Sequence, residues 1–303
     1  MRVGVLMGGE SSERSVSLRS GEAVCEAINQ LGYEAISIDP CRLSDTLDAL
    51  KSVEKVFIAL HGNLGESGHI QGLLDWLEIP YTGSGLSSSS ICLNKHRARQ
   101  VLSEQGFHYA KWQAVHRSHN AEAIVAAAEH VGYPLVVKPT SQGCSIGVTK
   151  VSSPEDLSAA VRQAFDYDDN ILLEGFISGK EYTCGILGDQ ALPVVQIRSE
   201  TFFDWAAKFG TQTATYHCPS DLSPSEEQAI QAVSLAAFHA LGCRGWGRLD
   251  IILGDDGRIY PIEMNTSPGM TPRSVFPMAS REIGLDFAQT IESILALASF
   301  DPV

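Results

Sequence analysis

Short apolar stretches alternate with amphipathic ones in the first part of the chain, and this alternation limits the fold more than any other sequence feature. Val3–Met7, Glu34–Ile38 and Lys55–Leu60 each have the length and apolar content of a buried strand. Ser15–Leu31 and Ile70–Leu77 have helical spacing instead. Because strands that alternate with helices usually form a parallel sheet with helices on its faces, we predict a doubly wound α/β domain.

The chain changes character after a small, polar stretch at 82–90, where we place a domain boundary. Asn94 is expected to cap a helix that ends near Gln105. Further strands are predicted at Pro134–Lys138, Val148–Val151, Ile171–Glu174, Glu181–Leu187 and Leu192–Ile197, and further helices at Leu157–Phe165, Pro224–Leu241 and Asp286–Leu297. The length of the chain predicts two or three domains. We place three α/β domains, at 1–93, 94–178 and 179–303, of which the last two are α+β units.

Composition excludes several classes of protein. The chain has 22 Lys and Arg against 36 Asp and Glu, a formal net charge of −14, so its overall field repels nucleic acids and anionic membranes. No apolar run approaches the roughly 20 residues of a membrane span, and the N-terminus does not resemble a signal peptide. The seven cysteines lack paired spacing, which favours reduced thiols and a cytoplasmic location.

A hairpin near the C-terminus carries the strongest functional pattern, in strands Trp246–Leu253 and Arg258–Met264. If Leu253 pairs with Arg258, Arg248 faces Glu263 directly. Side-chain alternation then puts Arg248, Asp250, Glu263 and Asn265 on one face. The other face, with Leu249, Ile251, Ile262 and Met264, is expected in the core. Three oxygen ligands beside a guanidinium suit Mg²⁺ that bridges phosphates, whereas a surface hairpin with one salt bridge is the alternative.

A glycine-rich loop follows a buried strand that ends at Lys138. The loop contains Gly143, Ser145 and Gly147, and its backbone N–H groups could hold phosphates with the lysine as the counter-charge. The Walker pattern is absent, and an ordinary turn with an exposed lysine is the alternative.

Polar residues also follow the predicted N-terminal strands. Glu13 comes shortly after the first strand and His61 directly after the third, where ligands gather in doubly wound sheets. A helix cap and a structural histidine are the alternatives. A long irregular segment at 198–222 contains one lysine, Lys208, and its length is typical of a lid or a binding loop.

These motifs occur in an order that resembles one family. The chain contains, in sequence, Gly-Gly-x-Ser-x-Glu-Arg-x-Val-Ser, Leu-His-Gly, Tyr-Thr-Gly-Ser-Gly, Val-Lys-Pro with its glycine loop, Gly-Trp-Gly-Arg-x-Asp and Glu-x-Asn-Thr-x-Pro-Gly-Met-Thr. From about Arg2 to Ile294 it closely resembles the D-alanine–D-alanine ligases of the ATP-grasp superfamily. The resemblance implies three domains with ATP between the second and third, and an acyl-phosphate intermediate in peptidoglycan precursor synthesis.

The resemblance also implies roles for particular residues. Lys95, Lys138 and Ser145 match positions near the phosphates, Glu174, Ile177, Glu181 and Phe202 match the adenine and ribose site, and Lys208 matches the lid residue that reaches the γ-phosphate. Asp250, Glu263 and Asn265 match ligands of Mg²⁺, expected as two ions, with Mn²⁺ as a substitute. Glu13 matches the residue that receives the ammonium of the first D-alanine, Arg248 and the Gly269 N–H match the oxyanion pair, and His61, Ser274 and Val275 fall on the substrate side. The implied partners are D-alanine, ATP and a second copy of the chain in a homodimer.

Four positions depart from the family pattern. Gln142 and Cys144 stand where glutamate and serine are usual in the glycine loop, Phe209 replaces the lid tyrosine, and Asn94 replaces aspartate. Phenylalanine at the lid position resembles relatives that make D-alanyl-D-lactate, so a ligase with another acceptor, D-lactate or another amino acid, is an alternative. A binding protein without catalysis is a second alternative, which the set of charged residues disfavours because a pure binder needs no oxyanion arginine.

Overall fold

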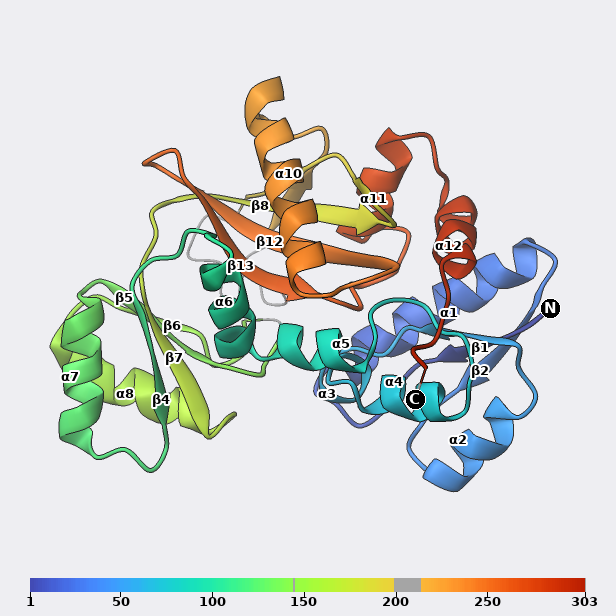
Figure 1. The fold of residues 1–303 in the computed structure, drawn as a ribbon, viewed down its shortest axis with the longest axis horizontal. Helices are drawn as coiled ribbons and strands as arrows, with labels where there is room; N and C mark the ends of the chain where they lie inside the picture. Colours follow the sequence, from blue (N-terminus) through green and yellow to red (C-terminus); the bar gives the residue numbers. More distant parts are fainter. Residues whose placement is uncertain (144, 199–213, 303) are drawn as a thin grey trace.

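The computed structural model describes residues 1–143, 145–198 and 214–302 (Figure 1). Its strands form three sheets in chain order, one from each of the predicted ranges 1–93, 94–178 and 179–303. The boundaries between those ranges stay a prediction. No helix in the described part of the chain is long and apolar enough to cross a membrane.

The first sheet is parallel, as predicted, with the order β2-β1-β3. Its strands are β1 (Arg2–Leu6), β2 (Glu34–Ile38) and β3 (Lys55–Ile58), and its helices are α1 (Arg14–Gln30), α2 (Leu43–Leu50), α3 (Asn63–Glu66), α4 (His69–Trp76) and α5 (Leu86–Leu93). Alternate residues of the strands face opposite sides: Val3 and Val5 pack on α1, whereas Leu6 packs with residues of α2 and α4. Both faces are therefore covered, which is the doubly wound arrangement.

The second sheet is antiparallel, with the order β4-β7-β5-β6. It comprises β4 (Trp112–His116), β5 (Leu135–Pro139), β6 (Thr149–Val151) and β7 (Asn170–Gly175), covered by α7 (Ala121–Val131) and α8 (Pro154–Phe165). Helix α6 (Lys95–Glu104) precedes it, and the Asn94 side chain accepts a hydrogen bond from the Arg97 N–H, which confirms the predicted cap.

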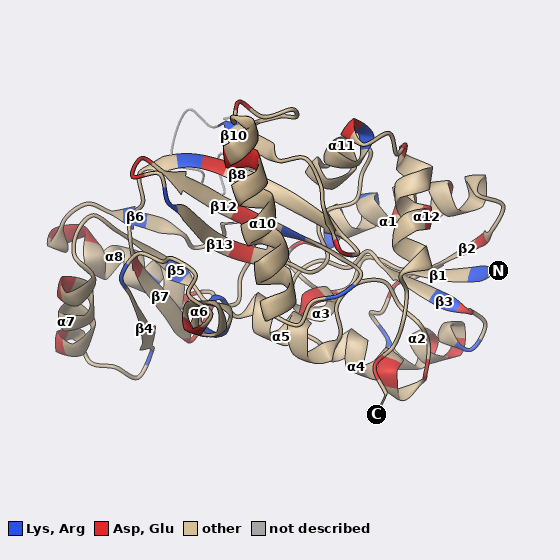
Figure 2. Ribbon diagram, turned by 45° about the horizontal axis from the view of Figure 1, so that its top comes forward, with Lys and Arg blue, Asp and Glu red and all other residues tan. Residues whose placement is uncertain are grey.

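The third sheet is also antiparallel and has the order β11-β10-β8-β12-β13, with β9 beside β8. Its strands are β8 (Gly179–Leu187), β9 (Gln190–Ala191), β10 (Val195–Arg198), β11 (Thr215–His217), β12 (Trp246–Gly254) and β13 (Ile259–Asn265), and its helix is α10 (Pro224–Ala240). Figure 2 shows acidic and basic residues together on β8, β12 and β13.

The C-terminal helices return to the first sheet (Figure 1). Helices α11 (Val275–Glu282) and α12 (Phe287–Ala296) follow β13, and α12 packs against α1. Trp246 and Phe276 share one buried cluster with residues of β1 and β3. Tyr81 forms isolated bridges with Val56 of β3 on one side and with Ser299 on the other, so a segment near the C-terminus extends the edge of the first sheet.

Candidate active site

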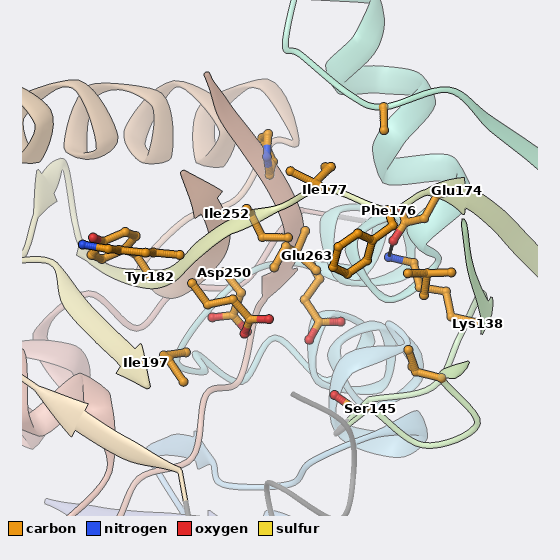
Figure 3. Close-up of a pocket in the computed structure, with 18 of the residues that line it drawn as sticks. Lys138, Ser145, Glu174, Phe176, Ile177, Tyr182, Ile197, Asp250, Ile252 and Glu263 are labelled. Carbon is orange, nitrogen blue, oxygen red and sulfur yellow. Dashed lines mark ion pairs between the residues drawn. The ribbon is translucent and has the colours of Figure 1, made fainter. Parts of the chain in front are cut away.

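A cavity of about 690 Å³ is lined by both antiparallel sheets (Figure 3). Six of the residues predicted for nucleotide binding line it, namely Lys95, Lys138, Ser145, Glu174, Ile177 and Glu181. Two of the predicted metal ligands, Asp250 and Glu263, line it from the other side, and in Figure 3 their carboxylates point into the same part of the cavity. The third, Asn265, lies farther along the same strand face.

The register of β5 and β7 explains how two charged residues reach this cavity. Val136 pairs with Glu174 and Lys138 pairs with Leu172, so Lys138 and Glu174 share one face on adjacent strands. The intervening Val137 points into the core between the sheet and its helices. Because side chains alternate between the two faces of a strand, Lys138 faces the cavity while Val137 packs in the core.

Glu174 is bound by two cations. Its Oε1 lies 2.5 Å from Lys138 Nζ, and its Oε2 accepts a hydrogen bond from Arg99 Nη2. Burial alone would raise the pKa of Glu174, but Arg99 and Lys138 lower it to about 2. Burial lowers the pKa of Lys138 below its ordinary value, and Glu174 opposes that change. The alternative of an exposed lysine in an ordinary turn is therefore wrong, since Lys138 is 3 % exposed.

Lys95 connects three parts of the site. Its Nζ lies 2.8 Å from a carboxylate oxygen of Glu263 and donates to the Gln142 carbonyl at 2.6 Å, and its backbone N–H donates to the Thr140 carbonyl. The first residue of α6 thereby holds the glycine-rich loop next to β13.

The hairpin has a different register from the predicted one. Leu253 pairs with Ile259, one residue later than predicted. A β-bulge between Asp250 and Ile251 shifts the pairing by one more residue, so Arg248 pairs with Asn265 and Asp250 with Glu263. The predicted pairing of Arg248 with Glu263 is wrong. The polar residues still share one face, since the shift at the turn and the shift at the bulge add up to two residues, which restores the alternation of faces.

The bulge also changes the position of Ile262. This residue was expected in the core with Leu249 and Met264, but it lines the cavity together with Ile252 and Pro261. A bulge inserts one residue without a partner, so the alternation of faces breaks at that point. Ile252, Pro261 and Ile262 therefore form an apolar part of the cavity wall.

Asp250 is held by hydrogen bonds from three neighbours. Arg248 donates from Nε and Nη2, each at 2.8 Å, while Thr183 Oγ1 donates at 2.6 Å and Asn265 Nδ2 at 3.1 Å. Burial alone would lower the pKa of Arg248, but Asp250 raises it above its ordinary value, so the guanidinium stays charged.

The donor set of this face fits a magnesium ion. Mg²⁺ prefers oxygen ligands and is usually held by one or two carboxylates together with phosphates. Asp250 and Glu263 supply the carboxylates and Asn265 can supply an amide oxygen. The described residues contain no group of three or more His, Cys, Asp or Glu that could hold a metal alone. Two carboxylates and an amide suit an ion whose remaining ligands are phosphate oxygens.

The glycine-rich loop after β5 is fixed at its start and tight at its end. One oxygen of Asp168 accepts hydrogen bonds from Thr140 Oγ1 and the Ser141 N–H, both at 2.9 Å. Ser145 has a positive φ of 57°, which is uncommon for a residue other than glycine. A Cβ at Gly147 would lie 2.8 Å from the Tyr167 ring, so only glycine fits there without a shift.

A second cavity, of about 320 Å³, lies on the other side of this loop. Glu13, Gly62, Gly143 and Tyr167 are among the residues that line it. A Cβ at Gly143 would lie 2.7 Å from a carboxylate oxygen of Glu13, so the loop backbone passes directly beside that carboxylate. The loop therefore separates the cavity that contains Glu13 from the one that contains Lys138.

Comparison with known proteins agrees with this geometry. The family model described as D-ala D-ala ligase C-terminus matches residues 101–296, and the D-ala D-ala ligase N-terminus model matches residues 40–84. The chain belongs to the D-alanine–D-alanine ligase family. Its fold is ATP-grasp, with a parallel sheet followed by two antiparallel sheets.

Solved structures of this family superpose on nearly the whole chain. The D-alanine–D-alanine ligase from Bacillus anthracis is 32 % identical, with a TM-score of 0.89 and coverage of 98 % of this chain and 97 % of that one. The same enzyme complexed with ATP gives 31 % identity, a TM-score of 0.85 and the same coverage. The VanG D-Ala:D-Ser ligase from Enterococcus faecalis is 29 % identical, with a TM-score of 0.86 and coverage of 98 % of both chains.

His61 of this ligase-family chain is only 4 % exposed and lines neither cavity. Its Nδ1 donates to the Ser267 carbonyl at 2.9 Å, so its Nε2 accepts from Ser20 Oγ at 3.1 Å, and Ser20 accepts from the Met270 N–H. Burial lowers the pKa of His61. These bonds fit a structural histidine that holds the 266–270 loop, and its contact with substrate stays a prediction.

The remaining substrate-side residues lie at the start of α11. Ser274 precedes the helix, and its Oγ accepts from the Thr271 N–H, while Val275 is the first helical residue. A Cβ at Gly269 would lie 3.6 Å from Ser274 Oγ, so Gly269 lies beside Ser274. Their predicted contacts with substrate stay predictions. Cys144, Phe202, Lys208 and Phe209 lie outside the described residues.

Two residues in or beside the site, Arg99 and Glu66, are not predicted from the sequence. Arg99 lies one turn after Lys95 on α6, and this i, i+4 spacing could have pointed to it. Glu66 accepts hydrogen bonds from the Gly62 N–H at 2.9 Å and the Ser267 N–H at 3.4 Å, and burial together with nearby Glu13 raises its pKa to about 8. Nothing in the local sequence distinguishes Glu66 from an exposed helix glutamate.

Proposed function

We propose that this member of the family uses ATP to activate D-alanine as an acyl phosphate and joins it to a second small molecule. One arrangement carries the proposal: a glycine-rich loop lies between a cavity with buried cations and carboxylates and a cavity with Glu13. The first cavity has lysines that can bind the phosphates of a nucleoside triphosphate and carboxylates that can bind its metal ion. The second has the Glu13 carboxylate, which can bind an ammonium group. A carboxylate of D-alanine placed at the loop would lie between them.

The first step is phosphoryl transfer. The carboxylate oxygen of D-alanine attacks the γ-phosphorus of ATP, the bond from that phosphorus to the β–γ bridging oxygen breaks, and ADP leaves. Lys95 and Lys138 hold the phosphates, and Glu13 holds the ammonium of D-alanine. Since phosphoryl transfer depends mainly on positioning and on charge neutralisation, no covalent enzyme nucleophile is needed.

Asp250, Glu263 and Asn265 would hold Mg²⁺ in this reaction, as two ions or with Mn²⁺ as a substitute. When bound, the metal neutralises charge that develops on the phosphates. Arg248 and Thr183 orient Asp250 through the hydrogen bonds described above, which fixes the direction in which the carboxylate presents its oxygens.

The second step is attack on the acyl phosphate. The amine of the second molecule loses a proton and forms a bond with the carbonyl carbon, and the bond from that carbon to the phosphate oxygen breaks. Arg248, kept charged by Asp250, and the Gly269 N–H are the donors that we assign to the intermediate oxyanion. We place the reaction in cytoplasmic peptidoglycan precursor synthesis, in a homodimer, on the basis of the family.

A different acceptor is the second candidate. The similar VanG enzyme is described as a D-Ala:D-Ser ligase, and Cys144 and Phe209 depart from the usual family residues. A phenylalanine lacks the hydroxyl with which a tyrosine donates a hydrogen bond, so the acceptor site would lose a polar partner. D-serine and D-lactate are therefore the acceptors to compare with D-alanine.

Mass spectrometry of the products from ATP, D-alanine and each acceptor tests this. With D-lactate in excess at pH 6, we expect measurable D-alanyl-D-lactate, because the competing amine of D-alanine is largely protonated there. Its share should fall as the pH rises. The double variant C144S/F209Y should shift the products towards D-alanyl-D-alanine. If the native enzyme makes only D-alanyl-D-alanine at pH 6, neither substitution changes the acceptor.

A further inference from the structure

Arg99 is a buried arginine that the reaction described above does not use. It lies on α6, is 4 % exposed and contributes to the wall of the larger cavity. Its guanidinium lies over the Tyr109 ring, 4.5 Å from the ring centre, and 6.0 Å from the centre of the Trp112 ring. The two aromatic residues therefore fix its position.

The guanidinium uses one side to bind Glu174. Its Nη2 donates to Glu174 Oε2, whereas its Nη1 is buried and has no hydrogen-bond partner within the described part of the chain. Because Nη1 is enclosed by protein, direct contact between Arg99 and a nucleotide would need the side chain to move. Arg99 therefore acts on the cavity through Glu174.

The contact between Arg99 and Glu174 changes the net charge on this side of the cavity. Glu174 is a single carboxylate between two cations, with Oε1 facing Lys138 and Oε2 facing Arg99, so the three groups carry a net charge of +1. Lys95, by contrast, forms an ion pair with Glu263. If Arg99 were absent, Lys138 and Glu174 would form a neutral pair as well, and this side of the cavity would lose its excess positive charge.

We propose that Arg99 is a positioning residue that neutralises Glu174 and so leaves the Lys138 ammonium with an uncompensated positive charge for the nucleotide phosphates. The proposal rests on the proposed use of ATP. In this proposal Glu174 does more than form a structural ion pair. Its carboxylate orients Lys138, and Arg99 offsets the negative charge of that carboxylate.

The test compares nucleotide affinities of Arg99→Met with those of the native chain, without D-alanine, for ATP, ADP and adenosine. We expect the Kd of R99M for ATP and ADP to rise about 10- to 100-fold, the scale for losing one charge several ångströms from a phosphate at an effective dielectric constant of about 20. The Kd for adenosine should stay within about twofold, because adenosine has no phosphate. Arg97→Met removes the same charge from an exposed position of the same helix and should leave all three values unchanged.

Glu174→Gln combined with R99M separates charge from packing. In the double variant Lys138 has no carboxylate partner, so the net charge returns to +1, and the affinity for ATP should recover at least about tenfold over R99M. Arg99→Lys keeps the charge and should bind ATP better than R99M. Loss of adenosine binding in R99M, or no recovery in the double variant, would show a structural role only and overturn the proposal.

The same measurements distinguish a failure of the proposed function from a failure of the proposed role of Arg99. If the native chain does not bind ATP, the proposed function fails and the role of Arg99 fails with it. If the native chain binds ATP and R99M binds it equally well, only the role of Arg99 is wrong. Circular dichroism and thermal unfolding of each variant establish that the compared proteins are folded.

Discussion

The charged residues of the site form ion pairs whose members come from different elements. Glu263 of β13 pairs with Lys95 of α6, and Glu174 of β7 pairs with Lys138 of β5 and Arg99 of α6. The cations are buried and the carboxylates largely buried, so a change to one member removes a counter-charge that water replaces only poorly. Single substitutions at these residues are therefore informative.

Glu263→Gln tests the metal assignment. The amide keeps the size of the side chain but removes the negative charge, so phosphate release with ATP and D-alanine should fall about 100-fold or more, as expected when a group that stabilises developing charge is lost. Glu104→Gln, an exposed glutamate at the end of α6, is the control and should have native activity. Near-native phosphate release by folded E263Q would contradict the assignment.

Glu174 gives a prediction about acid stability. Its pKa in the folded chain is about 2, below its ordinary value of 4.5, because Arg99 and Lys138 outweigh the effect of burial. A lowered pKa stabilises the fold above pH 4.5, and this contribution is lost as the pH falls from 4.5 towards 2. At about 1.4 kcal/mol per pH unit, the loss amounts to about 3 kcal/mol.

The measurement is the difference in unfolding free energy between the native chain and Glu174→Gln across this pH range. Glutamine does not titrate, so the advantage of the native chain should shrink by about 3 kcal/mol between pH 5 and pH 2. A difference that stays constant with pH would mean that Glu174 has an ordinary pKa.

At the scale of residues, the sequence was informative wherever a residue type is unusual in its place. A lysine at the end of an apolar strand, Lys138, pointed to the cavity correctly. Glu66 cannot be assigned from the sequence, because its partner Ser267 is distant in the chain. The i, i+4 spacing from Lys95 points to Arg99, but not to its ion pair with Glu174. Local sequence carries no information on such contacts.

At the scale of elements, helix α6 links the stability of the fold to the site. Asn94 caps this helix directly before Lys95, and Asn120 caps α7 in the same way, with hydrogen bonds of 3.1 Å and 2.9 Å to the N–H groups of Arg97 and Ala123. The two caps are chemically matched, but only the first adjoins the cavity.

Asn94→Ala and Asn120→Ala should each reduce the unfolding free energy by about 1 kcal/mol, the usual effect of losing a cap. Only Asn94→Ala should also raise the KM for ATP, because fraying of the first turn moves Lys95 away from Glu263. Equal KM values in both variants would show that the start of α6 is held by tertiary contacts alone.

The elements that the sequence predicted are those with a clear apolar period. Strands β1, β2 and β5 and helices α1, α10 and α12 lie within a few residues of their predicted bounds. Helix α5 falls in the small, polar stretch at 82–90 where we place a boundary, because its serines hide the pattern, and the sequence does not predict β4 or α7. The predicted register of the β12–β13 hairpin is wrong by one residue at the turn and by one more at the bulge, because both depend on how a strand meets its neighbours rather than on composition.

At the scale of the whole molecule, the C-terminal segment packs against the N-terminal sheet. Residues of the first sheet share one buried cluster with Trp246, Phe276 and α12, so the C-terminal segment stabilises the N-terminal domain. The sequence predicted three α/β units but not this return of the chain, since contacts between its two ends leave no local pattern. The arrangement brings Ser267 and Glu66 together and so joins the second cavity to the C-terminal loop.

Phosphate release with ATP and D-alanine as the only substrates tests the central claim most directly. We predict that the purified chain with Mg²⁺ releases phosphate and ADP in equal amounts, that release depends on D-alanine, and that Glu13→Gln greatly weakens this dependence. L-alanine in place of D-alanine should give only the background rate. If ATP stays intact with D-alanine at saturating concentrations, with or without D-serine or D-lactate, the account of an acyl-phosphate ligase is contradicted.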